Sequence, residues 1–290
     1  MNCFRNRYIL LLIAFLCNFF AAQSKYFFYE VSTDSSKVYI FGSIHFGKAE
    51  WYPFESYIED AFNNSDLLAT EVDLNKVNQL SFLSSIFAND TIDLKYKLKP
   101  KNYKKALKNL KKLGLDESTI KRLRPWFVAF SLQRQELLQG EINAKDGVDL
   151  YFTKKANDKN KPIIGLEEVD FQFSLLEKFD CCADEIIEKV DEQEYTDEKI
   201  TKITQAWLNG DDKTLDDLLN EIDGASEQYK NILHEILYKR NESFANSIES
   251  LLKDKKLCFV VVGAAHLIGK NSVIEYLKSN NRNYKITRIK

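Results

Sequence analysis

The sequence predicts an α/β fold with a mostly parallel sheet and helical insertions, and two patterns support this prediction. First, four short apolar runs are typical of strands buried on both faces, as strands are in parallel sheets; they cover residues 38–41, 66–70, 161–166 and 259–262. Second, the stretches between these runs place apolar residues at helical spacing, so that strands and helices alternate along the chain.

The helical stretches can be assigned in chain order. A helix over residues 54–64 joins the first two predicted strands into a strand–helix–strand unit. Further helices are expected over residues 101–113, 116–122, 126–138, 146–155, 180–222 and 226–253, and a last helix follows the final strand. Pro125 stands at a helix start, where proline is tolerated. Because no Ser/Pro/Gly-rich linker divides the chain, we expect one domain over residues 23–290.

The composition excludes several classes of partner. The chain has 290 residues, 44% of them hydrophobic, which suffices for a sizeable core. Its 41 basic and 43 acidic residues give a net charge of −2. Nucleic-acid-binding domains are usually strongly basic, and anionic membrane surfaces attract basic segments, so neither partner is expected here.

The N-terminus has the order of regions found in a secretory signal. Arg5 and Arg7 precede an apolar run over residues 8–20, and small and polar residues follow at 21–24. A membrane anchor is the alternative, but a spanning helix needs about 20 apolar residues, and this run is shorter. We therefore expect a signal peptide over residues 1–22, a secreted or periplasmic protein, and no stable membrane insertion after cleavage.

The cysteines do not form a disulfide framework or a zinc motif. Cys181, Cys182 and Cys258 remain after signal cleavage, which is an odd number, and the first two are adjacent. The sequence contains no CxxC pair and no Cys/His spacing typical of zinc sites.

Two of the predicted strands share one pattern, which suggests an approximate internal repeat. Each has four apolar residues, then Gly, two residues and His, over residues 38–45 and 259–266. His45 and His266 therefore both stand just beyond the C-terminal end of a GxxH-bearing strand. Ligands of open α/β sheets bind at that edge.

The other two strands end in carboxylates. Residues 66–70 lead into Glu71 and Asp73, and residues 161–166 lead into Glu167. If the four strands are neighbours in one sheet, His45, His266, Glu71 and Glu167 converge at its C-terminal edge.

The ordered set of motifs resembles the TraB/GumN family (TraB/PrgY/GumN), to which the Tiki metalloproteases are related, over residues 26–290. The motifs that carry the resemblance are, in chain order, Ile40-Phe41-Gly42-Ser43-Ile44-His45 with Tyr52-Pro53, Thr70-Glu71-Val72-Asp73, Arg124-Pro125-Trp126, Gly147-Val148-Asp149, Gly165-Leu166-Glu167 with Gln172, Trp207, Gly210-Asp211, Arg240-Asn241, and Val262-Gly263-Ala264-Ala265-His266. The set is specific for the family and much less so for the reaction, because the members differ in function.

The resemblance leaves three functions open. Tiki relatives are described as metal-dependent proteases, and other relatives are tied to pheromone shutdown or polysaccharide loci. More distant proteins of similar fold include an erythromycin esterase and a haem-iron binding protein. We therefore expect an exported, metal-dependent hydrolase that acts on a peptide, a protein or a small-molecule substrate. The alternatives are a metal-independent esterase that uses a His base, and a non-enzymatic protein that binds haem, iron or a peptide.

The residue types and the resemblance together suggest a metal site. His45, His266, Glu71 and Glu167 are the expected ligands of a divalent ion, which could be zinc, manganese, cobalt or iron. Such an ion would polarise a carbonyl group and lower the pKa of a bound water. Because no HExxH or other short metal spacing is present, the ion is inferred from residue types and resemblance alone.

Three residues are the expected catalytic groups. Glu71 would ligate the ion or take a proton from water, and Asp73 would assist it or cap the next helix. Arg124 would clamp a carboxylate or an oxyanion, or pack on Trp126 as structure. Arg240 and Asn241 are expected to form structural bonds, and His234 is expected to be packed or exposed rather than a ligand.

Overall fold

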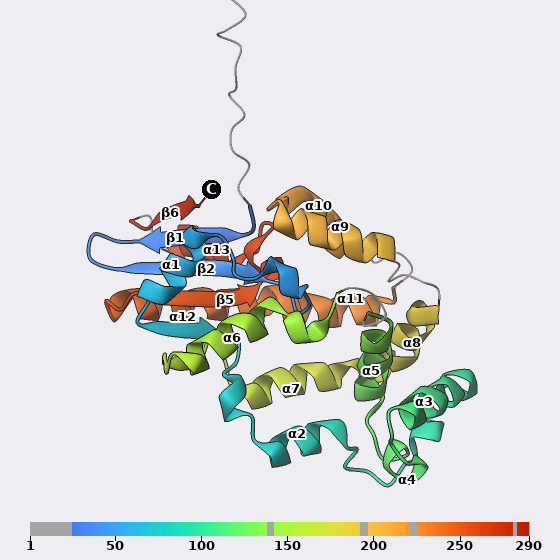
Figure 1. The fold of residues 1–290 in the computed structure, drawn as a ribbon. Coiled ribbons are helices and arrows are strands. Elements are labelled where there is room, and N and C mark those ends of the chain that lie inside the picture. Colours follow the sequence, from blue (N-terminus) through green and yellow to red (C-terminus); the bar gives the residue numbers. More distant parts are fainter. Residues whose placement is uncertain (1–24, 138–141, 192–196, 221–224, 281–282, 290) are drawn as a thin grey trace, which may run out of the picture.

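The computed structural model describes residues 25–137, 142–191, 197–220, 225–280 and 283–289. Within these ranges the protein has an α/β fold, with a six-stranded mixed sheet and many helices, which confirms the α/β part of the prediction (Figure 1). The predicted signal peptide, residues 1–22, lies outside the described residues. In the part of the chain that is described, no helix is both long and apolar enough to span a membrane.

The sheet has the strand order β4-β3-β5-β2-β1-β6. Its strands are β1 (Phe28–Ser32), β2 (Lys37–Ser43), β3 (Leu67–Thr70), β4 (Ile163–Gly165), β5 (Cys258–Gly263) and β6 (Lys285–Arg288). The four strands that the sequence predicts, β2 to β5, pair in parallel with one another. Strands β1 and β6 add antiparallel pairs at one edge, so the sheet is mixed rather than almost entirely parallel.

The two GxxH-bearing strands, β2 and β5, lie side by side in the sheet. Their pairing sets Ser43 opposite Gly263 and Gly42 opposite Val262, so the glycines of the two motifs are offset by one residue. Because successive residues of a strand face opposite sides of a sheet, this offset places the two motifs in different surroundings. The internal repeat stays a prediction.

The helices cover the sheet and extend beyond its β3–β4 edge. They are α1 (Ser56–Asn64), α2 (Gln79–Ile86), α3 (Pro100–Lys112), α4 (Glu117–Ile120), α5 (Pro125–Leu137), α6 (Val148–Asp158), α7 (Val169–Glu177), α8 (Ala183–Asp191), α9 (Asp197–Leu208), α10 (Asp212–Asn220), α11 (Glu227–His234), α12 (Arg240–Lys253) and α13 (Val273–Asn280). The acidic stretch expected as helical over 180–222 divides into several helices, and a π-helical turn, Glu235–Lys239, joins α11 to α12.

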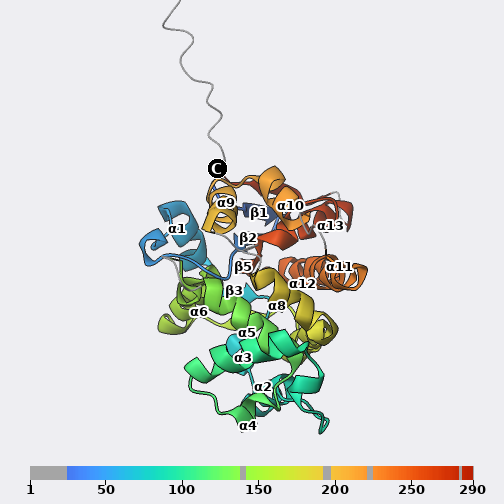
Figure 2. The same cartoon turned by 90° about the vertical axis from the view of Figure 1, so that its right-hand side faces the viewer.

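Two hydrophobic cores hold these elements together. The sheet core packs aromatic side chains such as Phe41, Phe152 and Phe259 between the strands and helices that include α1, α6 and α12. The helical core joins α3, α5, α8 and α11 through side chains such as Leu110, Leu132 and Ile187. Figure 2 shows α3 and α5, two helices of this helical core, beyond β3 and on the side of the sheet opposite to β1.

Gly42 makes the close packing at the end of β2 possible. A Cβ atom at this position would lie 2.7 Å from Phe27 Cβ and 3.1 Å from the backbone of Ala264. A larger residue would push β2 away from the turn that carries His266, so this glycine is required by close approach of neighbouring segments.

Candidate active site

The C-terminal ends of four neighbouring parallel strands form one edge of the sheet, and the predicted site residues follow these ends. His45 comes two residues after β2, Glu71 directly after β3, Glu167 two residues after β4, and His266 three residues after β5. The structure links Glu71 directly to His266, with 3.6 Å between Glu71 Oε1 and His266 Nε2. Glu71 and Glu167 bind the same arginine, and His45 lines the same pocket as Glu71.

Arg240, at the start of α12, holds both carboxylates. Its Nη2 donates to Glu71 Oε2 at 2.6 Å and also to Glu167 Oε1, while its Nε donates to Glu167 Oε2 at 3.0 Å. All three side chains are 10% exposed or less. The π-helical turn contributes as well, because Arg240 Nη1 donates to the carbonyl of Ile236. Each buried charge therefore has a partner, as buried charges require.

Glu71 is ionised at neutral pH despite its burial. Burial by itself raises the pKa of this carboxyl group, but the charges that His266, Arg240 and His45 carry in the acid range where Glu71 titrates, together with the Gly263 N–H, outweigh it. The result is a pKa lowered to about 2. The Gly263 N–H donates to Glu71 Oε1 at 2.8 Å, and the Gln172 amide donates to Oε2 at 3.4 Å. Glu71 is thus a fixed anion of the site.

His266 is a buried, neutral ring with a defined tautomer. The Asn241 amide donates to the carbonyl of Asn271 at 2.6 Å, so its Oδ1 accepts a hydrogen bond from His266 Nδ1, also at 2.6 Å. This pattern assigns the ring proton to Nδ1 and leaves a lone pair on Nε2, facing Glu71. Burial lowers the pKa of His266 to about 4, although the Glu71 charge acts in the opposite direction.

His45 has a different environment. Its Nδ1 lies 2.9 Å from Asp149 Oδ2, and Ser43 Oγ donates to Asp149 Oδ1 at 2.6 Å. The charge of Asp149 raises the pKa of His45 to about 9, although solvent reaches 76% of the His45 side chain. Gly147 lets the start of α6 approach His45, since a Cβ there would lie 2.9 Å from the His45 carbonyl oxygen. That approach brings Asp149 to the ring.

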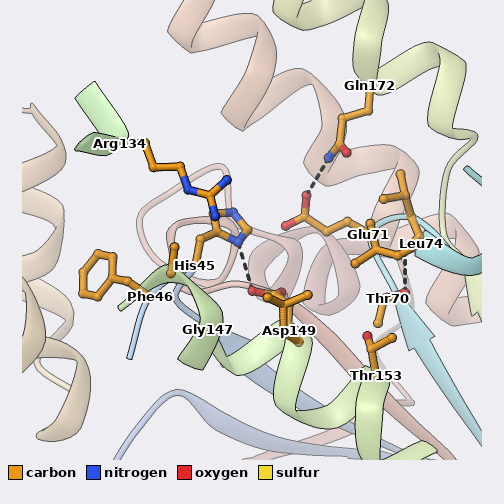
Figure 3. Close-up of a pocket in the computed structure, with 13 residues that line it drawn as sticks. His45, Phe46, Thr70, Glu71, Leu74, Arg134, Gly147, Asp149, Thr153 and Gln172 are labelled. Carbon is orange, nitrogen blue, oxygen red and sulfur yellow. Dashed lines mark hydrogen bonds and ion pairs between the residues drawn. The ribbon is translucent and has the colours of Figure 1, made fainter. Parts of the chain in front are cut away.

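A pocket of about 400 Å³ opens beside His45, Asp149 and Glu71, whereas His266, Arg240 and Glu167 are not among its lining residues (Figure 3). The residues that line it are His45, Phe46, Thr70, Glu71, Val72, Leu74, Arg134, Ala144, Gly147, Asp149, Leu150, Thr153 and Gln172. Figure 3 shows the His45 ring, paired with Asp149, on one side of this pocket and Glu71 with Gln172 on the other. A ligand in the pocket would therefore contact both the His45–Asp149 pair and the Glu71–Gln172 pair.

The other predicted residues lie elsewhere or have structural contacts. Asp73 accepts from the Asn75 N–H at 3.0 Å and caps the short turn Leu74–Lys76, which was the alternative role expected for it. Arg124 pairs with Asp180 and Glu177 in the helical core region and is not among the pocket residues. His234 packs its ring on Tyr238, at 5.2 Å between ring centroids.

Sequence reasoning underrated three residues that the structure brings into the site. Asp149 and Asn241 each bind the Nδ1 side of one strand-end histidine, and Arg240 binds two carboxylates. All three stand in motifs that carry the family resemblance. One general rule could have pointed to two of them, because a functional histidine usually has an oxygen partner on its second ring nitrogen. A search for polar residues within the remaining motifs would then have singled out Asp149 and Asn241.

The donor set has the chemistry of a metal site in part. Both histidines direct Nδ1 to an oxygen partner, which is the usual outer contact of a metal-binding histidine and leaves Nε2 available. His266 Nε2 and Glu71 Oε1 are two hydrogen-bond acceptors 3.6 Å apart, an arrangement that a cation stabilises. Glu167 fits less well, since Arg240 occupies both of its oxygens. Over the described residues, no group of three or more His, Cys, Asp and Glu side chains lies so that it could hold a metal ion.

Fold and site together define a class: an α/β protein with a histidine–carboxylate site at the C-terminal edge of its parallel strands. Within that class, the chain belongs to the TraB/PrgY/gumN family, whose model matches residues 27–288.

The chain is similar to several bacterial proteins. It is 21% identical over 245 residues to the uncharacterized protein YbaP of Escherichia coli (strain K12), covering 83% of this chain and 87% of that protein. The same figures hold for YbaP of Shigella flexneri. It is also 20% identical over 272 residues to an uncharacterized protein of Treponema pallidum (strain Nichols), covering 87% of this chain and 80% of that protein. No solved structure matches the chain significantly.

Proposed function

We propose that this protein is an exported, metal-dependent hydrolase that cleaves peptide or protein substrates in the pocket above His45 and Glu71. The observation that carries the proposal is the buried pair of facing acceptors, His266 Nε2 and Glu71 Oε1. In addition, His266 and the exposed His45 both contact oxygen partners through Nδ1. Family membership supports the same class of reaction, because Tiki relatives are described as metal-dependent proteases.

In this proposal His45 Nε2, His266 Nε2 and the Glu71 carboxylate would hold a divalent ion, and His45, whose pKa is raised to about 9, would release its Nε2 proton to solvent when the ion binds. The ion would polarise the scissile carbonyl group and lower the pKa of a bound water. Mixed imidazole and carboxylate ligands suit zinc, manganese, cobalt or iron. We assign Glu167 to positioning Arg240 rather than to the ion, because both Glu167 oxygens already accept from that guanidinium.

The remaining residues would keep this set in place. Arg240 and the Gly263 N–H orient the Glu71 carboxylate, and Asn241 orients His266. Asp149 accepts the Nδ1 proton of His45 and directs Nε2 away from itself. With a pKa of about 2, Glu71 is a weak base at neutral pH, so we assign it to binding rather than to proton transfer.

A second candidate is a metal-independent esterase, and the Asp149–His45 contact favours it. A carboxylate that binds Nδ1 orients a histidine for acid–base catalysis. With a pKa near 9, however, His45 is protonated at neutral pH and would serve as an acid. The base of this candidate would then be His266, which is neutral at that pH.

Metal removal and return distinguishes the candidates. Untagged protein is treated with a chelator, dialysed and assayed on a mixed peptide library and on ester substrates, with and without manganese, zinc, cobalt or iron. We expect peptide cleavage only after metal return, together with binding of one equivalent of metal measured by calorimetry. Full ester cleavage by metal-free protein would favour the second candidate. Tight haem binding in a spectral titration, without cleavage of any substrate, would instead favour a binding protein.

A further inference from the structure

Arg134, on α5, differs from the other charged residues of the pocket. His45 is paired with Asp149, and Glu71 is paired with Arg240. Arg134 lines the same pocket but has no hydrogen bond or ion pair with any residue that the structure describes. Figure 3 shows its guanidinium directed toward the pocket, on the His45 side. Among the described residues, Arg134 is therefore the pocket cation without a bound partner, and we take it as the group that could bind a ligand.

The walls around this cation are apolar. Phe46, Val72, Leu74 and Leu150 line the pocket, and the rest of the lining includes small and methyl-bearing side chains. Leu74 and Leu150 are 42% and 41% exposed, so they present apolar surface to the pocket. A volume of about 400 Å³ accommodates one or two apolar side chains.

We propose that the pocket selects an apolar residue accompanied by a carboxylate, which Arg134 binds. A guanidinium pairs with a carboxylate through two parallel hydrogen bonds, while the apolar walls of the pocket contact the apolar residue beside it. The same guanidinium repels cationic ligands, so it would act as a specificity residue. This inference rests on the proposed function, because it assigns the substrate class of the same pocket. The carboxylate could be the C-terminus of a peptide or the side chain of an acidic residue.

The test measures binding without relying on cleavage. The full mature protein, without added metal, is titrated by calorimetry with three probes: N-acetyl-Leu-Leu as the free acid, its C-terminal amide, and N-acetyl-Asp-Leu amide. Arg134→Gln is the test variant. Arg122→Gln is its matched control, because Arg122 is also exposed and has no ion-pair partner among the described residues, but does not line the pocket.

We expect wild-type protein and Arg122→Gln to bind at least one carboxylate probe about ten-fold more tightly than the plain amide, which is the factor that a charge-assisted hydrogen bond provides. Arg134→Gln should lose that preference and bind the plain amide unchanged. Leu150→Ser should weaken the binding of all three probes. Preference for the free acid assigns the C-terminus as the source of the carboxylate, and preference for the Asp probe assigns a side chain.

Several results would overturn the inference: equal binding of acid and amide, a preference that survives in Arg134→Gln, or no binding of any probe. The proposed function fails separately. If the protein prefers carboxylate probes but cleaves nothing under any metal condition, the proposed hydrolase activity is wrong and the proposed binding specificity stands. If it shows metal-dependent cleavage without this preference, the hydrolase activity stands and the binding specificity is wrong.

Discussion

Two arginines in different regions of this protein each hold a pair of carboxylates, and comparing them separates structural from functional chemistry. Arg240, at the sheet edge, is 5% exposed and binds Glu71 and Glu167. Arg124, in the helical part, is 19% exposed and binds Asp180 and Glu177, and Asp180 also accepts the Trp126 N–H at the start of α5. The carboxylates that Arg240 binds include the pocket residue Glu71, whereas those that Arg124 binds connect helices to one another.

The lesson is that residue type and local motif do not distinguish the two roles. Both arginines stand in motifs that resemble the family, and sequence reasoning favoured Arg124 for a site role. The structure brings Arg240 to the pocket edge because α12 lies against the sheet, whereas α5 belongs mostly to the helical core. Whether such an ion pair supports the candidate site or only the fold depends on how deeply it is buried and on which residues surround its carboxylates.

The largest expected effect is the loss of Arg240. Arg240→Met should lower the free energy of unfolding by about 3–5 kcal/mol at pH 7, because it leaves two buried carboxylates without a partner. Arg124→Met should cost only about 1–2 kcal/mol, since its partners are partly solvated. Urea unfolding of both variants checks the comparison. Equal losses would show that the two arginine sites do not differ energetically.

The strand-end histidines should lose function together. His45→Ala, His266→Ala and the double variant should each reduce substrate turnover by about 10²–10³-fold or more, with little additivity, because groups that act as a unit are not additive. His234→Ala, on α11, is the matched control and should keep most activity. Turnover and thermal unfolding are measured for all four proteins. An active His266→Ala protein alongside an inactive His234→Ala protein would refute the site assignment.

The two histidines should also respond to pH in opposite directions. His266 has a folded pKa of about 4, below its unfolded value, so protonation favours the unfolded chain and stability falls as the pH drops from about 6.5 to 4. The loss should reach roughly 3 kcal/mol at full effect. His266→Gln should remove most of this fall.

His45 has the opposite linkage. Its folded pKa of about 9 lies above the unfolded value, so its contribution to stability is complete below about pH 6.5 and disappears as the pH rises through 9. His45→Gln should flatten the alkaline limb and leave the acid limb in place. Unfolding followed from pH 4 to 10 measures both limbs. If both variants flatten the same limb, the contrast between the two environments is wrong.

The smallest expected effect is the change in stability when one carboxylate partner of Arg124 is lost, compared with the loss of one carboxylate partner of Arg240. Glu177→Gln should change the free energy of unfolding by less than about 1 kcal/mol, because Glu177 is 34% exposed and surface ion pairs contribute little. Glu167→Gln, at a 6% exposed side chain, should cost more and should also weaken binding in the pocket through Arg240. Denaturation and ligand titration of the two variants provide the check.

Much of the fold could be predicted because the signals are local. Runs of apolar β-branched and aromatic residues predicted β2 to β5, and the spacing between them predicted α1, α3 and α12 in outline. Strands β1 and β6 escaped prediction. In β6 (Lys285–Arg288), exposed residues alternate with partly buried ones, as suits an edge strand but not a buried run.

The candidate site was predictable only on its strand side. His45, Glu71, Glu167 and His266 stand at strand ends, and parallel pairing alone brings those ends to one edge. The contacts that give each residue its charge state come from distant helices. Asp149 lies 104 residues from His45, and Arg240 lies 169 residues from Glu71. No local pattern predicts such pairs.

By itself, the sequence determined the α/β class, the four parallel strands, the edge at which their polar ends meet and the family. Only the tertiary structure decided how those polar ends differ from one another. The one-residue offset between β2 and β5, together with the packing of α6 and α12, leaves His45 in contact with solvent and Asp149, and leaves His266 buried beside Glu71. The physical reason is that strand formation depends on neighbouring residues, whereas desolvation and charge pairing depend on whatever side chain the fold packs against a group.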